Sequence, residues 1–430
     1  MLEPYFDAVM HCRPNRWQGK VNQVVGHLLE SDGPLCSVGE CCEVEAAGRC
    51  FAGEIVGFRG AKVLAMCLDR PQGIRYGDRI LAWGQRPEIR AGEGLLGRVI
   101  DATGQPLDGL GPYTARQSRA VDAVAPLPLS RLPIREPLGC GVRAIDGFLT
   151  CGRGQRMGIF GGSGVGKSTL IGMMARGTSA DLTVLALVGE RGREVGEFLE
   201  ELGEEGRSRS VVVVSTSDQS PLLRIRAALA ATTIAEYFCE QKKQVLLVVD
   251  SLTRFAMAQR EIGLAAGEPP TAKGYTPSVF TLLSRLVERA GRFNGGSITA
   301  FYTVLMEGDD EQDPLVDAVR SLLDGHILLD RELAARGHYP PISILNSLSR
   351  LMPAVCSEEH RKKTAELRAL LALYARSEDL IRVGAYQKGS DPELDAAIAV
   401  LPILESFLRQ DSATTAALTD NIPALLALRN

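Results

Sequence analysis

The sequence has little net charge, few aromatic residues and no long apolar run. Its 48 basic and 52 acidic residues leave a net charge of −4 over 430 residues. A strongly basic nucleic-acid binder has a different balance, so we expect no nucleic-acid partner. The longest apolar runs, such as residues 245–249, have the length of buried strands and fall far short of the ~20 residues that a membrane-spanning helix needs. No basic segment followed by an apolar stretch opens the chain, and we expect a cytoplasmic location.

Cysteine and histidine are also scarce. Ten cysteines are too few for a disulfide scaffold, and none shows the Cys-x-x-Cys spacing of a zinc knuckle. The five histidines have no metal-ligand spacing either. We interpret the cysteines as reduced core thiols. Glycine, at 45 residues, is abundant and directs attention to loops whose backbone N–H groups bind phosphate.

The pattern of apolar residues, glycines and prolines changes along the chain. It predicts an α/β protein whose core follows a small barrel and precedes a helical region. Residues 1–18 are mixed, with Phe6, Val9 and Met10 at the spacing of a docking helix or of a packed turn. Residues 19–88 hold short β-rich runs broken by glycine, which predict a small β-barrel. We expect strands at 20–25, 54–58, 62–68 and 79–83.

A proline-rich stretch, 87–140, reads as a connector that wraps a larger domain. Apolar runs then alternate with helical segments, which indicates a parallel α/β sheet within residues 89–347. We expect its strands at 156–160, 183–188, 211–214, 244–249, 297–305 and 326–329. Residues 348–430 form the helical remainder, in which Leu367, Leu370, Leu371 and Tyr374 repeat at helical spacing.

A glycine-rich motif lies between the first of these strands and a helix. It reads Gly161-Gly162-Ser163-Gly164-Val165-Gly166-Lys167-Ser168, followed by Thr169. Glycines let consecutive N–H groups surround phosphate oxygens, and the helix N-terminus adds a favourable dipole. Lys167 brings a positive charge to the β- and γ-phosphates, and the Ser168 hydroxyl can ligate Mg²⁺. The motif predicts a site for ATP and Mg²⁺; the alternative is a glycine-rich helix cap.

Two further carboxylates follow predicted strands. Asp250 ends the apolar run 244–249, which places it at the sheet edge where ligands of α/β folds bind. It is a candidate Mg²⁺ ligand, with a mere helix cap as the alternative. Glu190 ends the 183–188 run and can orient the attacking water. The residues alone leave equally open a surface salt-bridge cluster with Arg191 and Arg193.

Longer stretches resemble the type III protein-export ATPases of the flagellum and injectisome, relatives of the rotary ATP synthase catalytic subunit. The resemblance runs from about residue 17 to about 408, and five stretches carry it: 93–109 (EGLLGRVIDATGQPLDG), 187–194 (LVGERGRE), 250–280, 296–314 and 338–352. It implies a RecA-like P-loop NTPase core behind the small barrel and ahead of the helical C-terminal domain.

The resemblance also implies roles for single residues. Glu190 matches the catalytic carboxylate of the family and Arg191 its companion. Arg254 matches a basic residue near the γ-phosphate, and Tyr339 an aromatic ring stacked on adenine. Arg350 resembles an arginine finger that reaches the nucleotide of a neighbouring subunit, with an ordinary salt bridge as the alternative.

A finger in trans implies a ring, and the resemblance suggests a homohexamer. It further implies a stator-like regulatory partner at residues 1–18, a coiled-coil stalk protein, export-gate membrane proteins, and export substrates with their chaperones. The expected function is Mg²⁺-dependent ATP hydrolysis that energises export, unfolds substrates and detaches chaperones, at the cytoplasmic face of the inner membrane.

Three alternatives remain at this point. Residues 255–259 and 384–391 favour a flagellar member, whereas residues 260–271 and 167–169 favour the injectisome branch, and we favour the flagellar one. A non-catalytic nucleotide-binding ring subunit would be expected to lack Glu190. An RNA-translocating hexamer would need more aromatics and a basic stripe on the barrel.

Overall fold

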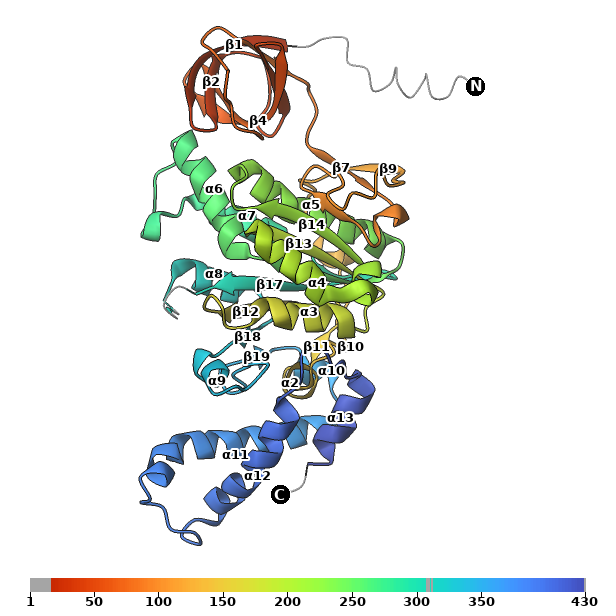
Figure 1. Ribbon diagram of the computed structural model, residues 1–430, viewed down its shortest axis with the longest axis vertical. Helices are drawn as coiled ribbons and strands as arrows, with labels where there is room; N and C mark the ends of the chain where they lie inside the picture. Colours follow the sequence, from red (N-terminus) through yellow and green to blue (C-terminus); the bar gives the residue numbers. More distant parts are fainter. Residues whose placement is uncertain (1–16, 307–309, 311, 429–430) are drawn as a thin grey trace.

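The computed structural model describes residues 17–306, 310 and 312–428. The helical or turn structure predicted around Phe6 therefore lies outside the described residues. A closed β-barrel, a central α/β part and a group of C-terminal helices follow one another along the long axis of the molecule (Figure 1). This architecture confirms the predicted fold class. Within the described residues, no helix is both long and apolar enough to cross a membrane.

The barrel is a single closed sheet in the order β1-β2-β5-β4-β3-β6. Its strands are β1 (Trp17–Val25), β2 (Leu28–Asp32), β3 (Cys41–Ala46), β4 (Arg49–Arg59), β5 (Lys62–Cys67) and β6 (Arg79–Ala82). Alternate side chains, including Val21, Leu29, Val44, Ile55 and Ile80, are fully buried and fill the interior. The strands β2 and β3 were not predicted, because their sequences LLESD and CCEVEA carry outward-facing acidic residues between the buried ones.

The central part is built on a nine-stranded sheet in the order β19-β18-β12-β17-β15-β13-β14-β8, with β16 paired to β17. All the predicted strands are present: β12 (Arg156–Gly161), β13 (Leu182–Glu190), β14 (Ser210–Thr216), β15 (Gln244–Asp250), β17 (Ser297–Leu305) and β18 (Gly325–Leu328). Neighbours among these strands pair in parallel, which brings their C-terminal ends to one edge of the sheet. The short β16 (Gly291–Arg292) and β19 (Leu348–Ser349) pair antiparallel.

The stretch 87–140 is more than a connector. Within it β8 (Val99–Asp101) adds an edge strand to the main sheet beside β14, and β7 (Glu88–Ala91) pairs with β9 (Gln117–Ala120). The two-residue strands β10 (Pro137–Leu138) and β11 (Cys151–Gly152) form a small sheet of their own. Single-turn helices η1 (Glu93–Leu95) and η2 (Pro128–Ser130) complete this region.

Helices cover both faces of the main sheet. Along β15, Val245, Leu247 and Val249 pack in the core under one set of helices, and Leu246 and Val248 pack in the core on the other face. The first set is α5 (Pro221–Glu240), α6 (Leu252–Ala266), α7 (Pro277–Val287) and α8 (Pro314–Leu322), with η3 (Ala272–Gly274) between α6 and α7. The second is α3 (Lys167–Gly177) and α4 (Gly192–Ser208), with α2 (Arg143–Phe148) beside them.

The C-terminal helices pack on α2, except the first and shortest, which contacts β11. They are α10 (Met352–Val355), α11 (Glu358–Arg382), α12 (Pro392–Leu408) and α13 (Leu418–Leu426), while α9 (Arg331–Ala335) precedes them in the central part. Leu367, predicted at an apolar position of α11, is fully buried. The predicted boundary at residue 347 falls just before β19, which still belongs to the main sheet.

Candidate active site

The glycine-rich motif forms a loop that connects β12 to α3 at the C-terminal edge of the sheet. Gly164 and Gly166 have φ angles of +76° and +102°, a region that residues with a Cβ rarely adopt. No side chain caps α3, so the N–H groups of its first turn remain available for a ligand. Ser163, Gly164 and Ser168 are exposed on this loop. The loop therefore presents a helix N-terminus to solvent where an anion binds favourably.

The Lys167 side chain folds back into the loop. Its Nζ donates to the carbonyl oxygen of Gly161 at 2.9 Å and to that of Gly162, and the residue is buried. The Gly161 carbonyl also accepts from the N–H of Met306 at 3.2 Å, which ties the loop to the end of β17. A polyphosphate in the loop offers the ammonium a charged acceptor in place of these neutral ones.

Asp250 is buried at the end of β15, next to the loop. The Thr303 hydroxyl, from β17, donates to Asp250 Oδ1 at 2.5 Å. Burial raises the pKa of Asp250, and the Thr303 hydrogen bond and the positive charges of Lys167 and Arg254 oppose that rise. The carboxylate thus lies within the field of the loop lysine. Thr303 was not singled out from the sequence, because a threonine within an apolar strand carries no signal of its own.

The residues at the loop fit Mg²⁺ held together with a nucleotide. Among residues 17–306, 310 and 312–428, no group of three or more His, Cys, Asp or Glu side chains is arranged to hold a metal ion. Mg²⁺ in proteins keeps several waters and takes one or two protein oxygens plus substrate phosphates. The buried Asp250 carboxylate and the exposed Ser168 hydroxyl supply oxygens of that kind.

Glu190 lies at the end of β13, the strand adjacent to β15. Arg254, in the first turn of α6, places its Nε 3.4 Å from Glu190 Oε1. Burial, together with the negative charge of Asp250 and a hydrogen bond with Glu194, raises the pKa of Glu190 to about 8, and the positive charge of Arg254 opposes that rise. A half-buried carboxyl with a pKa in this range, beside a phosphate loop, is suited to general-base chemistry near neutral pH.

Glu194 holds the turn that follows Glu190. Its carboxylate accepts from the Arg191 N–H at 3.5 Å, and its Oε1 lies 3.6 Å from Arg191 Nη1. Arg191 itself is exposed, and Arg193 pairs with Glu197 on α4. The salt-bridge cluster considered for Glu190 with Arg191 and Arg193 is therefore not what the structure shows. Glu194 was missed as a partner of Glu190, although a glutamate at the third position of a helix is a recognised capping signal.

Tyr339 and Arg350 lie near opposite ends of β18. The Tyr339 segment follows the C-terminal end of this strand, and Arg350 lies at its N-terminal end. Tyr339 is half-exposed, and its carbonyl accepts from the Gln410 N–H at 2.9 Å. A Cβ at Gly166 of the phosphate loop would lie 4.0 Å from Cδ of Pro341, two residues after Tyr339, which is an ordinary contact distance. Arg350 is exposed beyond β19, and its N–H donates to the Asp324 carbonyl at 3.0 Å, before the N-terminal end of β18. The length of β12, roughly 16 Å at about 3.3 Å per residue, separates this edge from the loop. The structure thus brings Lys167, Asp250, Glu190 and Arg254 together at the phosphate loop, whereas Arg350 lies at the other edge of the sheet and Arg191 faces outward.

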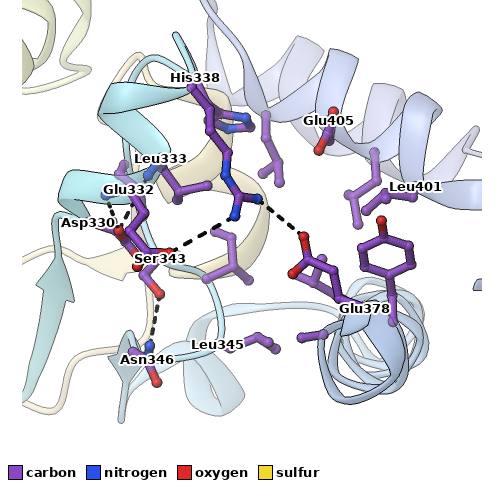
Figure 2. A pocket seen from close by; sticks show the side chains of 18 residues that line it. Asp330, Glu332, Leu333, His338, Ser343, Leu345, Asn346, Glu378, Leu401 and Glu405 are labelled. Carbon is purple, nitrogen blue, oxygen red and sulfur yellow. Dashed lines mark hydrogen bonds and ion pairs between the residues drawn. The ribbon is translucent and has the colours of Figure 1, made fainter. Parts of the chain in front are cut away.

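A cavity of about 270 Å³ lies near Tyr339 but apart from the phosphate loop (Figure 2). It is enclosed by α9 with the segment that follows it and by α11 and α12, and its lining includes Leu333, Leu345 and Leu401. Arg336 is one of its lining residues, and Arg336 Nη1 lies 3.4 Å from Glu378 Oε1 on α11. No residue of the loop 161–169 is among those that line it.

Comparisons with known proteins identify the family. Residues 141–349 match the model of the ATP synthase alpha/beta family, nucleotide-binding domain, and residues 356–427 match the T3SS EscN ATPase C-terminal domain. The chain is 51% identical to the flagellum-specific ATP synthase of Bacillus subtilis over 95% of this chain and 94% of that protein. It is 50% identical to the SPI-2 type 3 secretion system ATPase of Salmonella typhimurium, over 92% and 90%.

Solved structures agree. The assembled ATPase EscN of the enteropathogenic E. coli type III secretion system matches with a TM-score of 0.91 at 45% identity, over 95% of this chain and 99% of that one. EscN in complex with its central stalk EscO matches with a TM-score of 0.88 at 44% identity over the same shares. With near full-length matches of this kind and an intact phosphate loop, the chain belongs to the type III protein-export ATPases and is an ATPase.

Proposed function

We propose that this protein hydrolyses Mg²⁺-bound ATP in a homohexameric ring and thereby energises type III protein export, unfolding substrates and releasing their chaperones. The observation that carries the proposal is the gathering of Lys167, Asp250, Glu190 and Arg254 at the C-terminal edge of the sheet, on the phosphate loop. Positive charge, a metal-binding carboxylate and a candidate base are the groups that phosphoryl transfer to water needs.

Each of these residues has a task in hydrolysis. Lys167 exchanges the carbonyls of Gly161 and Gly162 for the β- and γ-phosphates, and the N–H groups of the α3 first turn bind the remaining oxygens. Glu190, once ionised, accepts a hydrogen bond from the attacking water and orients it. Arg254 holds the Glu190 carboxylate in place and adds positive charge beside the γ-phosphate. Bound Mg²⁺ supplies further positive charge to the β- and γ-phosphates, with Asp250 and Ser168 as its protein ligands.

The remaining positive charge at the γ-phosphate comes from the Arg350 guanidinium of a neighbouring protomer. Arg350 lies at the sheet edge opposite the phosphate loop and cannot reach the nucleotide of its own protomer. An exposed guanidinium in that place serves catalysis when the neighbouring protomer brings its loop to it, and a closed ring with equivalent interfaces completes every site in this way. The adenine of the nucleotide stacks on Tyr339 in this arrangement.

The relatives suggest the partners. EscN has been solved in assembled form and with its central stalk, and by this likeness we assign our protein a coiled-coil stalk partner at the ring axis. We further propose a stator-like regulator on residues 1–18, export-gate membrane proteins facing the C-terminal helices, and a cytoplasmic location peripheral to the inner membrane.

We assign the protein to flagellar export. Its identity to the flagellum-specific relative from Bacillus subtilis is 51%, against 50% to the SPI-2 injectisome relative, so the preference rests on residues 255–259 and 384–391. Expression in a flagellated bacterium that lacks its own export ATPase tests it. We expect motility to return there, and no return of secretion in a strain that lacks its injectisome ATPase. The reverse pattern would reassign the protein.

Turnover of the purified full chain tests the enzymatic proposal. We expect phosphate release from ATP to require Mg²⁺ and to rise more steeply than linearly with protein concentration, because active sites are completed only on assembly. Turnover that is strictly proportional to protein concentration, from dilute monomer upward, would rule out the shared site. No turnover at any concentration would rule out the enzyme.

A further inference from the structure

An apolar segment lies exposed on the surface between β9 and β10. We call residues 123–132 the strap. Val124, Leu127 and Leu129 in it are 92%, 75% and 99% exposed, and Leu132 is also exposed. Single exposed leucines are common on protein surfaces, but several apolar side chains within one short segment mark an interaction surface.

Within residues 17–306, 310 and 312–428, the leucine side chains of the strap are not buried against the rest of the protein. A cavity of about 590 Å³ lies beneath it, lined by Val124, Pro126 and Ser130 of the strap and by Phe293 and Ile298 below. Pro126 and Pro128 restrict the backbone, so the segment loses little conformational entropy when a partner covers it. The strap is thus a conformationally restricted apolar surface that the other described residues of the protomer leave uncovered.

The strap is fixed to the sheet edge that also presents Arg350. Arg131, its only charged residue, turns inward and donates from Nη1 to the Ala290 carbonyl at 2.8 Å, and its Nη2 lies 3.1 Å from Glu288 Oε2. A second series of contacts continues from there: Arg156 Nη1 donates to Glu288 Oε1 at 2.5 Å. The Arg156 N–H and side chain also bind the Asp324 carboxylate.

Asp324 completes the connection to the finger. Its carbonyl accepts the Arg350 N–H at 3.0 Å, as described above. The strap and Arg350 are therefore the two ends of one network of ion pairs and hydrogen bonds along the N-terminal edge of the sheet. Whatever surface Arg350 faces in an assembly, the strap is held at the same edge of the protomer.

We propose that the strap is an apolar anchor of the interface between neighbouring copies of this chain, on the same sheet edge as Arg350. The inference rests on the proposed function, which places Arg350 against a second copy. A membrane surface is the less fitting occupant, because segments that bind membranes carry clusters of free cations. Here Arg119 pairs with Glu240 at 2.5 Å and Arg292 with Glu136 at 2.6 Å, and Arg135, exposed three residues after the strap, is one charge and makes no such cluster.

Sedimentation velocity of the full chain with a non-hydrolysable ATP analogue tests the strap. The double variant Leu127→Glu with Leu129→Glu places two charges on it. Because burial of each leucine stabilises the assembly, we expect the double variant to need a protein concentration at least about tenfold higher than the wild type before it assembles. Val383→Glu is the matched control, since Val383 is 75% exposed at the end of α11, in the C-terminal helical part of the chain. Unchanged assembly of the double variant would overturn the inference.

Two further measurements distinguish a failure of the strap interface from misfolding of the variant and from a failure of the proposed function. The double variant should bind a fluorescent ATP analogue as the wild type does, because the strap lies away from the phosphate loop. A photo-crosslinking side chain in place of the almost fully exposed Leu129 should join two copies of the chain. Crosslinks that form only to vesicles of anionic lipid, or none to a second copy, would overturn the strap interface. Crosslinked copies without any ATP turnover would overturn the proposed function and leave the interface standing.

Discussion

Arg254 Nε lies 3.4 Å from Glu190 Oε1, and this contact joins the first turn of α6 to the end of β13. The two residues meet because β13 and β15 are adjacent and parallel, with Leu187 opposite Asp250, so the segments after both strands emerge at one edge. The pairing holds a partly buried carboxylate beside the phosphate loop. It is the relationship on which the proposed chemistry depends.

Replacement of Glu190 by glutamine should abolish hydrolysis and spare binding. The amide is isosteric but cannot take the water's proton, and loss of a general base costs about 10²- to 10⁴-fold in rate. We expect turnover to fall by at least about 100-fold, with the affinity for an ATP analogue unchanged. Glu197→Gln is the control, because Glu197 is exposed on α4 and pairs only weakly with Arg193. Equal turnover in the two variants would exclude Glu190 from catalysis.

The raised pKa of Glu190 makes stability depend on pH in a defined direction. Burial, the Asp250 charge and Glu194 raise the pKa from 4.5 to about 8 in the folded protein. The folded state then binds a proton that the unfolded state has lost, so this group's contribution to stability is complete below about pH 4.5 and declines as pH rises to about 8. The Glu190→Gln protein should therefore melt above the wild type at alkaline pH, by a margin that vanishes near pH 4.5. A margin that grows toward acid pH would contradict the assignment.

Gly189 should not tolerate a side chain. Its φ angle is +69°, and a Cβ there would approach Arg254 Cδ to 2.8 Å and Arg254 Cβ to 3.2 Å. Gly189→Ala should displace Arg254 from Glu190 and lower turnover, in addition to about 1 kcal/mol of backbone strain. Gly192→Ala is the comparison, because the space around a Cβ at Gly192 is open. Turnover and melting temperature of the two variants test this prediction. Equal values would show that the contact between Arg254 and Glu190 is dispensable.

Asn421 should anchor the C-terminal helices in a pH-dependent way. Its Nδ2 donates to Asp146 Oδ2 at 2.8 Å, while the Cys140 N–H donates to Oδ1 at 2.8 Å. Burial raises the pKa of Asp146 to about 7. Asn421→Ala should cost about 1–3 kcal/mol of unfolding free energy, and more above pH 7, where the unpaired carboxylate is ionised. Denaturant titrations at acid and alkaline pH measure this, with the exposed Asn294→Ala as control. A cost independent of pH would show that Asp146 is not the partner that matters.

The main sheet was predictable because its strands are long apolar runs that end in recognisable motifs. The strand β8 was not, since Val99–Asp101 is three residues long within a proline- and glycine-rich stretch, and its pairing with β14 is determined by contacts more than 100 residues away in sequence. Strands β2 and β3 were missed for a related reason: acidic residues on their outer face mask the alternation.

The site was predictable where a motif fixes the backbone and unpredictable where partners come from other elements. The loop 161–169, Asp250 and Glu190 follow strands directly, so their place at the sheet edge could be inferred. Thr303 on β17 and Glu194 on α4 contact them only through the fold. The strap could likewise not be predicted from the sequence, because the exposure of its leucines depends on how the rest of the chain folds around them.

The central claim is a site completed by a neighbour, and mixing two inactive proteins tests it most directly. Lys167→Ala removes the loop ammonium and keeps the finger, while Arg350→Ala keeps the loop and removes the finger. Each alone should lose about 10³-fold or more in turnover. When the two are mixed and assembled, sites that combine an intact Lys167 with an intact Arg350 from the next protomer should form, and turnover should return. A mixture that forms mixed assemblies yet stays as inactive as either variant would contradict the shared site.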